Sequence, residues 1–389
     1  MLMYLSIFGS ISIFAIMEVM GLIKKTKTSK CIVYSYLVLF FLLTCIRWGG
    51  PGDWDNYYDF FLSLPGHSLA MPNNPHGFEI GYVYLNVFVR LFTDNYSVFL
   101  AVGGLILLIA QILMFRNLCY EKQDVFLKND YQSLRLYPKE VSGFPVFSLL
   151  IVWTIHFSYL FFIRSHFAFA ICAVGLVFVK KKKPFLFILT VLLAMLFHKS
   201  AIVFFVVYPI YHLSISKNWL ILLTFIGSLL MLFLFEPAVR LFANFCGGAL
   251  GARILSYLNR GPEAGYGSVY SFAVNLIKGV FNFVFLLILY FFTYESQKNN
   301  KWYLGLLNIY CFGCVLYAGT MLASQALSRA VGLFLDVQIF MTPYLIGVFR
   351  YRDNRFVASL VLIVYLLLRL IVGLGQLSNS YYPFPSVFG

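Results

Sequence analysis

The sequence is poor in charged residues. Only 11% of its 389 residues are charged, against about 25% in an ordinary soluble domain. Hydrophobic residues make up 61% of the chain, and a soluble fold of this length cannot bury so much apolar surface. Soluble enzymes are therefore excluded, and the composition indicates an all-α polytopic membrane protein.

Several other features are missing. The seven cysteines show no disulfide spacing, and Cys311 and Cys314 lie in an apolar segment, where buried small side chains are expected rather than a metal or redox pair. No basic stretch precedes the first apolar run, so we expect a retained span and not a cleaved signal. We see no nucleotide-binding domain and no internal repeat. No cofactor and no metal are expected.

Apolar runs long enough to cross a bilayer recur along the chain, and they predict about 12 transmembrane helices in a single transmembrane domain, 1–389. The predicted spans are 2–23, 31–46, 97–115, 144–162, 165–179, 184–197, 201–213, 219–235, 270–292, 302–322, 328–349 and 356–375.

The basic residues set the expected orientation. The net charge is +14, and 19 of the 29 Lys and Arg fall in one set of loops while 8 fall in the opposite set. The positive-inside rule places the richer set in the cytoplasm and both termini outside. Because these cations lie in short loops between apolar runs, we expect contact with the bilayer and no nucleic-acid partner.

Two long loops are predicted on the outer side, at 47–96 and 236–269. Long ordered loops in a compact domain are usually functional. The segment 79–92 is apolar but carries Glu79, Asn86 and Arg90. We expect it to form a helix that lies at or dips into the outer membrane interface.

The first loop opens with Arg47 and a glycine- and proline-rich turn, followed by three carboxylates within seven residues. Asp53 and Asp55 are candidates for a general base, for substrate hydrogen bonds, for metal binding or for a structural role. Aromatic side chains beside carboxylates can stack on sugar rings or form an interfacial belt. The aromatic candidates are Trp54, Tyr57 and Tyr58.

Glu79 lies between apolar neighbours, where loss of water disfavours an ionised carboxylate unless an arginine is near. A catalytic base, an ion-pair partner and a carboxylate at a helix N-terminus are all compatible with this position.

Three arginines, Arg47, Arg164 and Arg329, are expected at outer ends of spans, against the positive-inside bias. Arginines there need an anionic partner. Ion pairs with Glu79, Asp336 or a lipid phosphate are one interpretation. The other is a clamp on a diphosphate, for which the guanidinium fork is well shaped. Together the three favour the clamp.

His198, Lys199 and Ser200 adjoin one another in a predicted outer turn. An imidazole there can act as a base near neutral pH, donate to a phosphate or have a purely structural role. Lys199 is a second candidate for diphosphate binding.

The order of these motifs resembles that of the EpsG/Wzy-like polysaccharide (O-antigen) polymerases. The resemblance rests on Arg47-Trp-Gly with Gly52-Asp-Trp-Asp-Asn-Tyr57, on Phe78-Glu-Ile-Gly81, on Arg164, on Phe197-His-Lys-Ser-Ala201 and on Ser328-Arg329. It runs from about Arg47 to Arg329.

The resemblance implies a metal-independent glycosyltransferase with a GT-C-like bundle in the bacterial inner membrane, active on the periplasmic side. Its donor and acceptor would be undecaprenyl-diphosphate-linked oligosaccharides, and a chain-length regulator protein would be a further partner. Asp53, Asp55, Glu79 and His198 would be the catalytic candidates, and the arginines would hold the departing diphosphate.

Two other functions stay open at this stage. A flippase or exporter of lipid-linked glycans would suit many spans, although transporters place charges near the bilayer midplane and often carry repeats. An O-antigen ligase-type transferase or a membrane acyltransferase is the second alternative.

Overall fold

The computed structural model describes residues 1–23, 26–49, 54–66, 68, 73–120, 143–156, 163–259, 269–323, 325–349 and 351–375. Regular secondary structure in these ranges is helical. The chain forms two compact units. The first consists chiefly of Met1–Phe205 and Arg350–Leu370, and the second of Val206–Phe349 and Ile371–Gln376.

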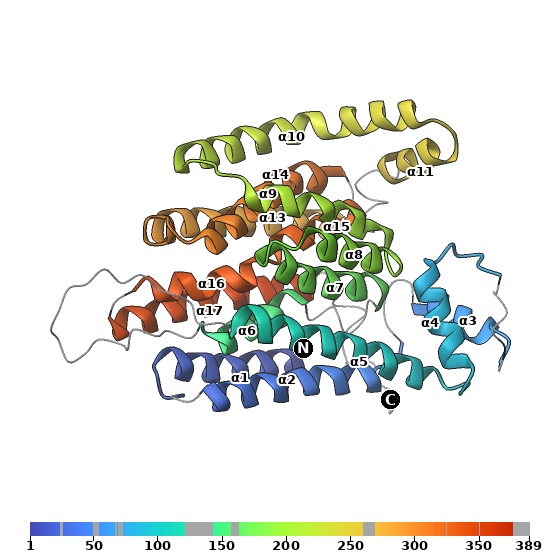
Figure 1. The fold of residues 1–389 in the computed structure, drawn as a ribbon, viewed down its shortest axis with the longest axis horizontal. Coiled ribbons are helices and arrows are strands. Elements are labelled where there is room, and N and C mark those ends of the chain that lie inside the picture. The colour runs from blue at the N-terminus through green and yellow to red at the C-terminus, as the bar shows by residue number, and fades with distance from the viewer. Residues whose placement is uncertain are drawn as a thin grey trace. The chain divides into compact units, whose positions relative to one another are not determined.

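The first unit is a bundle that combines long apolar helices with shorter ones (Figure 1). Within it α1 packs on α6, α2 on α5 and α6, α5 on α7, and α7 on α8. Its helices are α1 (Leu2–Val19), α2 (Thr26–Ile46), α3 (Trp54–Ser63), α4 (Ile80–Arg90), α5 (Tyr96–Met114), the π-helix η1 (Phe115–Cys119), α6 (Pro145–His156), α7 (Ile163–Lys180), α8 (Pro184–Met195), the 3₁₀ helix η3 (Lys199–Val206) and most of α17 (Arg352–Gly375).

The second unit is built around α14, a largely buried helix that contacts α9, α10, α13, α15 and α16. Its helices are α9 (Val207–His212), α10 (Lys217–Cys246), α11 (Gly248–Asn259), α13 (Val269–Gln297), α14 (Lys301–Ala323), α15 (Gln325–Leu335) and α16 (Gln338–Gly347).

Eight helices among the described residues are long and apolar enough to cross a membrane, and three shorter apolar helices accompany them. The protein is therefore an all-α polytopic membrane protein, as predicted. The count of 12 spans is not confirmed. The predicted span 201–213 forms the 3₁₀ helix η3 followed by the six-residue α9, and 328–349 is divided between α15 and α16.

Helix α10 continues beyond the predicted end of its span at residue 235. Glu236 and Arg240, read from the sequence as loop residues, form an ion pair one helical turn apart at 2.8 Å. The helix ends where Gly247 takes a positive φ of 58°, a conformation that suits glycine. Much of the expected second loop, 236–269, is thus helical as the end of α10 and as α11.

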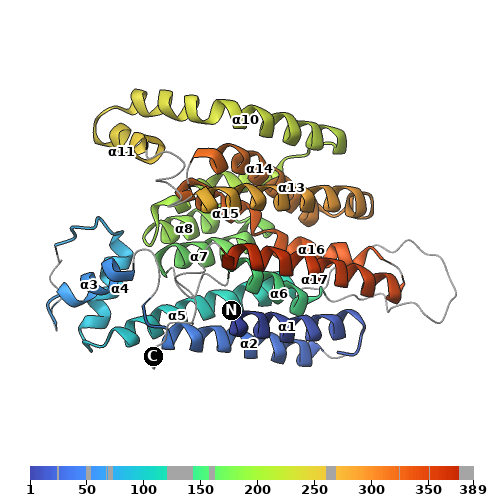
Figure 2. The same ribbon diagram turned by 180° about the vertical axis from the view of Figure 1, so that it is seen from behind.

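Helices α3 and α4 lie together next to the N-terminal end of α5 in both views (Figures 1 and 2). Each buries an aromatic face, and together with the start of α5 they form one hydrophobic cluster that includes Trp54, Phe61, Phe78, Tyr82 and Tyr96. The cluster holds the first predicted loop against the helical bundle and positions the candidate site.

Candidate functional site

Arg164, in the first turn of α7, is held at two of its three guanidinium nitrogens. Nη1 donates to Oε2 of Glu79 at 2.7 Å, and Nε donates to the hydroxyl of Tyr57 at 3.2 Å. The Arg164 and Glu79 side chains are only 15% and 9% exposed. Among the described residues, Nη2 makes no such bond. These two bonds fix the orientation of the arginine.

Aromatic rings surround the same guanidinium. Its central carbon, Cζ, lies 4.5 Å from the ring centre of Phe78, 5.2 Å from that of Tyr57 and 5.7 Å from that of Tyr82. These distances are within the range of cation–π attraction. Burial, with smaller effects of Tyr96 and Tyr57, raises the pKa of Tyr82 well above its ordinary value, so that this phenol stays neutral. We call Tyr57, Phe78 and Tyr82 the arginine cage.

Glu79 connects three segments of the chain. It is the N-cap residue of α4, its Oε2 pairs with Arg164 on α7, and its Oε1 accepts the backbone N–H of Lys199 at 3.2 Å. Lys199 is the first residue of η3, so Glu79 also satisfies a free donor at that helix start. Both carboxylate oxygens are thereby used, which favours positioning of Arg164 over proton abstraction.

Gly81 allows the turn before η3 to reach α4. Its N–H donates to the carbonyl oxygen of Leu196 at 2.8 Å. A Cβ atom at position 81 would lie 2.7 Å from both that oxygen and the Cβ of Leu196, which is closer than such atoms can approach. The Glu79-Ile-Gly81 motif thus has two functions in the fold. Glu79 supplies the carboxylate that binds Arg164, and Gly81 leaves the space that the backbone of Leu196 occupies.

The loop before Glu79 is fixed by Asn74. Its amide nitrogen donates to the carbonyl of Phe78 at 2.8 Å, and its amide oxygen accepts the N–H of Phe78 at 2.9 Å. Gly77 turns the chain between them with a φ of 63°. These bonds place the Phe78 ring over Arg164.

His198 has a defined partner at Nδ1. The hydroxyl of Ser200 lies 2.6 Å from this nitrogen, and the backbone N–H of Ser200 donates to it at 3.3 Å. A backbone N–H can only donate, so Nδ1 accepts, and the neutral ring assigned from these bonds carries its proton on Nε2. In this state the ring proton is on Nε2, and of the three roles considered for His198 a donor or a structural role fits these bonds.

The first-loop candidates differ in how far they are exposed. Asp53 lies outside the described residues. Asp55 is exposed on α3, whereas Trp54 and Tyr57 are buried and Tyr58 is half-buried. Little ring surface of Trp54 or Tyr57 is open for a sugar, and Tyr57 instead bonds to Arg164.

Arg47 is fully buried in the first unit. Its guanidinium carbon lies 5.0 Å from the ring centre of Trp54 and its charge acts on Tyr96. This arginine supports the aromatic cluster and has no surface for a diphosphate in this structure.

Arg329 and Lys199 both have exposed side chains. Arg329 lies on α15 in the second unit, next to Ser328, whose hydroxyl accepts from the amide of Asn275 at 3.2 Å. Lys199 belongs to the first unit and adjoins the Glu79–Arg164 pair through its backbone. That the three arginines meet stays a prediction.

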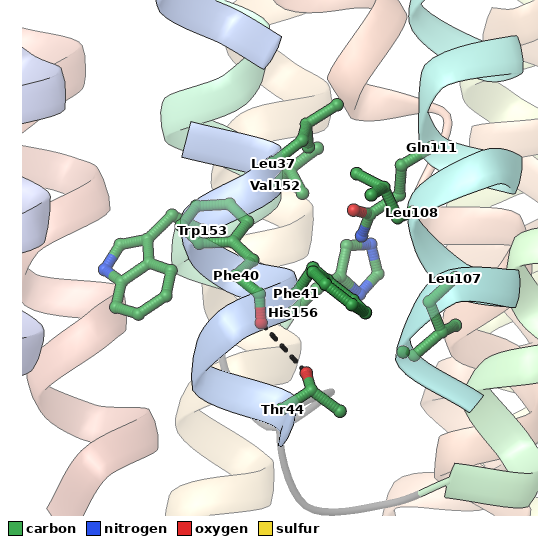
Figure 3. A pocket seen from close by; sticks show the side chains of 11 residues that line it. Leu37, Phe40, Phe41, Thr44, Leu107, Leu108, Gln111, Val152, Trp153 and His156 are labelled. Carbon is green, nitrogen blue, oxygen red and sulfur yellow. Dashed lines mark hydrogen bonds between the residues drawn. The ribbon is translucent and has the colours of Figure 1, made fainter. Parts of the chain in front are cut away.

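A separate cavity lies within the first unit among α2, α5 and α6 (Figure 3). Thr44, Gln111 and His156 are its polar lining, and the rest is apolar, with Phe40, Phe41 and Trp153 as its largest side chains. Its volume is about 30 Å³, which suits one or two water molecules and no sugar.

Sequence reasoning named Glu79 as one of three possible partners of Arg164, and the structure selects it. It missed Phe78 and Tyr82 as cage residues, the contact of Gly81 with Leu196 and the Nδ1 bonds of His198. Tertiary contacts set all of these, although Phe78-Glu-Ile-Gly81 and His198-Lys-Ser200 had marked the segments.

Comparison with known proteins places the chain in a family. A model of the EpsG family matches residues 30–386. No curated protein and no solved structure matches the chain significantly. The match covers nearly the whole length, including every segment that meets at Arg164. The chain therefore belongs to the EpsG family, polymerase-type membrane proteins of exopolysaccharide and O-antigen synthesis.

Proposed function

We propose that the protein is a glycosyltransferase of the bacterial inner membrane that polymerises undecaprenyl-diphosphate-linked oligosaccharide units on the periplasmic side. The hydroxyl of one lipid-linked unit attacks the anomeric carbon of the chain carried by the other. A new glycosidic bond forms, the bond from that carbon to the diphosphate oxygen breaks, and the lipid diphosphate leaves. Arg164 binds the departing diphosphate.

The observation that carries this proposal is the fixed guanidinium of Arg164. Glu79 and Tyr57 hold Nη1 and Nε, and the cage rings cover its faces. Donors that are oriented beforehand stabilise developing negative charge without the cost of reorganisation, and one such donor contributes about 3–4 kcal/mol in known enzymes. Nη2 is the nitrogen that would bind the anion.

Lys199, whose backbone bonds to Glu79, supplies a second positive charge. Its backbone is fixed by Glu79 while its side chain is exposed. A flexible ammonium suits a diphosphate that must enter and leave, whereas the held arginine sets the geometry.

The acceptor hydroxyl must lose a proton to a general base. Glu79 already accepts two hydrogen bonds, and Nδ1 of His198 accepts from Ser200. Because these two groups already accept hydrogen bonds, we assign the general base to an acidic residue of the first loop, Asp53 or Asp55. Metal-independent transfer is part of the proposal.

The test replaces Arg164 by Lys and by Ala and measures polysaccharide length in cells at matched protein abundance. We expect a loss of long chains in both variants, because the single ammonium nitrogen of lysine cannot reach Glu79, Tyr57 and an anion as three separate guanidinium nitrogens can. Arg90→Lys is the matched control. Arg90 packs on Phe61 and donates to the carbonyl of Leu64 at 2.8 Å.

Normal chain length in Arg164→Ala would refute the proposal. Accumulation of complete chains that are not attached to their final acceptor would indicate a ligase-type transferase. Repeat units retained on the cytoplasmic side would indicate a flippase.

A further inference from the structure

Helix α4 has hydrophobic side chains on two opposite faces. The inner face, with Tyr82, Val83 and Val87, is buried in the aromatic cluster. The outer face carries Ile80, Tyr84 and Phe88, which are 49%, 51% and 55% exposed, and Phe92, which is 71% exposed, follows two residues after the helix ends. We call these four residues the α4 stripe.

The stripe is continuous. Ile80, Tyr84 and Phe88 follow at intervals of four residues, which places them in one row along the helix. Phe92 continues the same spacing in the turn that follows Arg90. The rings of Phe88 and Phe92 are in contact, with centroids 5.3 Å apart. Single exposed hydrophobic residues are common on proteins, but a contiguous row of this kind marks an interaction surface.

Both ends of α4 are joined to apolar membrane helices of the same unit. At one end Gly81 bonds to Leu196, directly after α8, where Leu192, Leu193 and Leu196 are exposed. At the other end α5 begins at Tyr96, a few residues after Phe92, and it presents exposed Val98 in its first turn. The stripe thus connects two surfaces that already face lipid in a membrane protein.

The length of α4 decides how it can meet the bilayer. Eleven residues of helix span about 16 Å, roughly half of the hydrocarbon thickness. Two residues after Phe92 the carboxylate of Asp94 is exposed, so the chain is in water at that point. We propose that the α4 stripe lies among lipid acyl chains at the membrane surface, with the helix parallel to that surface.

This placement sets the depth of the candidate site. Ile80, the first member of the stripe, directly follows Glu79, which holds Arg164. The guanidinium is then held near lipid phosphate groups, where the diphosphate of any polyprenyl lipid lies. The inference about the stripe does not depend on the proposed reaction.

The test uses photo-crosslinking of the full-length protein in phosphatidylethanolamine–phosphatidylglycerol vesicles. Benzoylphenylalanine replaces Tyr84, Phe88 or Phe92 in turn, an aromatic-for-aromatic exchange at an exposed position. We expect lipid adducts, detected by mass spectrometry, at all three positions. Leu105, exposed on α5, is the lipid-facing control, and Asp59, exposed on α3, is the control for water.

Adducts at positions 84, 88 and 92 comparable in yield to those at position 105 would support the proposal. Yields no higher than at position 59 would overturn it, and so would adducts to protein in place of lipid. The same measurement in the Arg164→Lys background should be unchanged, which separates this inference from the proposed activity.

Discussion

Two buried carboxylates of the first unit each accept backbone N–H groups at the start of a helix, and Glu79 also binds a cation. Glu18 accepts the hydroxyl of Ser29 at 2.7 Å and the backbone N–H groups of Val146 and Phe147 at 2.9 and 3.3 Å, at the start of α6. Glu79 accepts the backbone N–H of Lys199 at the start of η3. Each carboxylate satisfies donors at a helix N-terminus supplied by a distant segment.

The difference is the cation. Within the described part of the chain, Glu18 pairs with no lysine or arginine, and its donors are one hydroxyl and two backbone N–H groups of packed helices. Glu79 binds Arg164, whose Nη2 makes no hydrogen bond to any other described residue. A buried carboxylate that bonds only to fixed donors anchors helices, whereas one that holds a cation also fixes the orientation of that cation. A mutation of Glu18 should therefore lower chiefly the stability, and a mutation of Glu79 should weaken chiefly ligand binding.

Glu18→Leu is expected to give the largest change. Leucine leaves the Ser29 hydroxyl and two backbone N–H groups without their acceptor, at a cost of about 2–4 kcal/mol in the free energy of unfolding. Denaturant unfolding in detergent measures the loss. Glu295→Leu, which removes an exposed glutamate paired with Lys217, is the control and should change little. An unchanged unfolding free energy in Glu18→Leu would break the comparison.

Glu79→Gln should affect binding more than stability. The amide still accepts from Lys199 but cannot neutralise Arg164, so the guanidinium loses its fixed position. We expect the Kd for a polyprenyl diphosphate to rise roughly 10- to 100-fold, with a smaller loss of stability than in Glu18→Leu. Isothermal calorimetry and thermal melts on the same preparation measure both. Unchanged binding combined with a large stability loss would make Glu79 a second anchor.

Gly81→Ala tests the attachment of the turn that supplies Lys199 to Glu79. The new methyl group would overlap Leu196, and such overpacking costs about 1–2 kcal/mol. We expect a lower melting temperature together with weaker diphosphate binding. Gly9→Ala in α1 is the matched control, because a Cβ there would have no atom within 4 Å apart from its chain neighbours and the nearby backbone of its own helix. Equal melting temperatures for the two variants would contradict the close contact.

Replacements of His198, the residue before Lys199, test which ring nitrogen of this histidine is used. The amide of Gln falls near the position of Nε2 and that of Asn near Nδ1. If His198 acts as a donor through Nε2, His198→Gln should retain several-fold more chain extension than His198→Asn. In vitro polymer length measures this difference. The reverse order would show that Nδ1 is the working nitrogen.

Most of the fold follows from hydropathy alone. Runs such as 2–23 and 97–115 contain α1 and α5 almost in full, because a helix that faces lipid must be apolar over its whole length. The end of α10 did not follow, since Glu236 and Arg240 read as loop residues until their pairing is known. The hydropathy pattern predicted one transmembrane domain and did not indicate the division into two compact units.

The site was predictable in its parts but not in its pairings. Short motifs marked Glu79, Arg164 and His198, and charge balance named Glu79 among the partners of Arg164. The cage could not be predicted, because Tyr57 and Phe78 meet Arg164 only after α3, α4 and α7 have packed. Stacking on sugars was predicted for Trp54 and Tyr57 because burial is not visible in a loop sequence.

The affinity of the purified protein for a polyprenyl diphosphate tests the role of Arg164 most directly. The measurement compares wild type with Arg164→Lys, and the corresponding polyprenyl monophosphate serves as reference ligand. We predict a Kd for the diphosphate that is roughly 10- to 100-fold higher in the variant, with a smaller change for the monophosphate. Equal affinities for the diphosphate, with the variant folded, would contradict the binding of that group by Arg164.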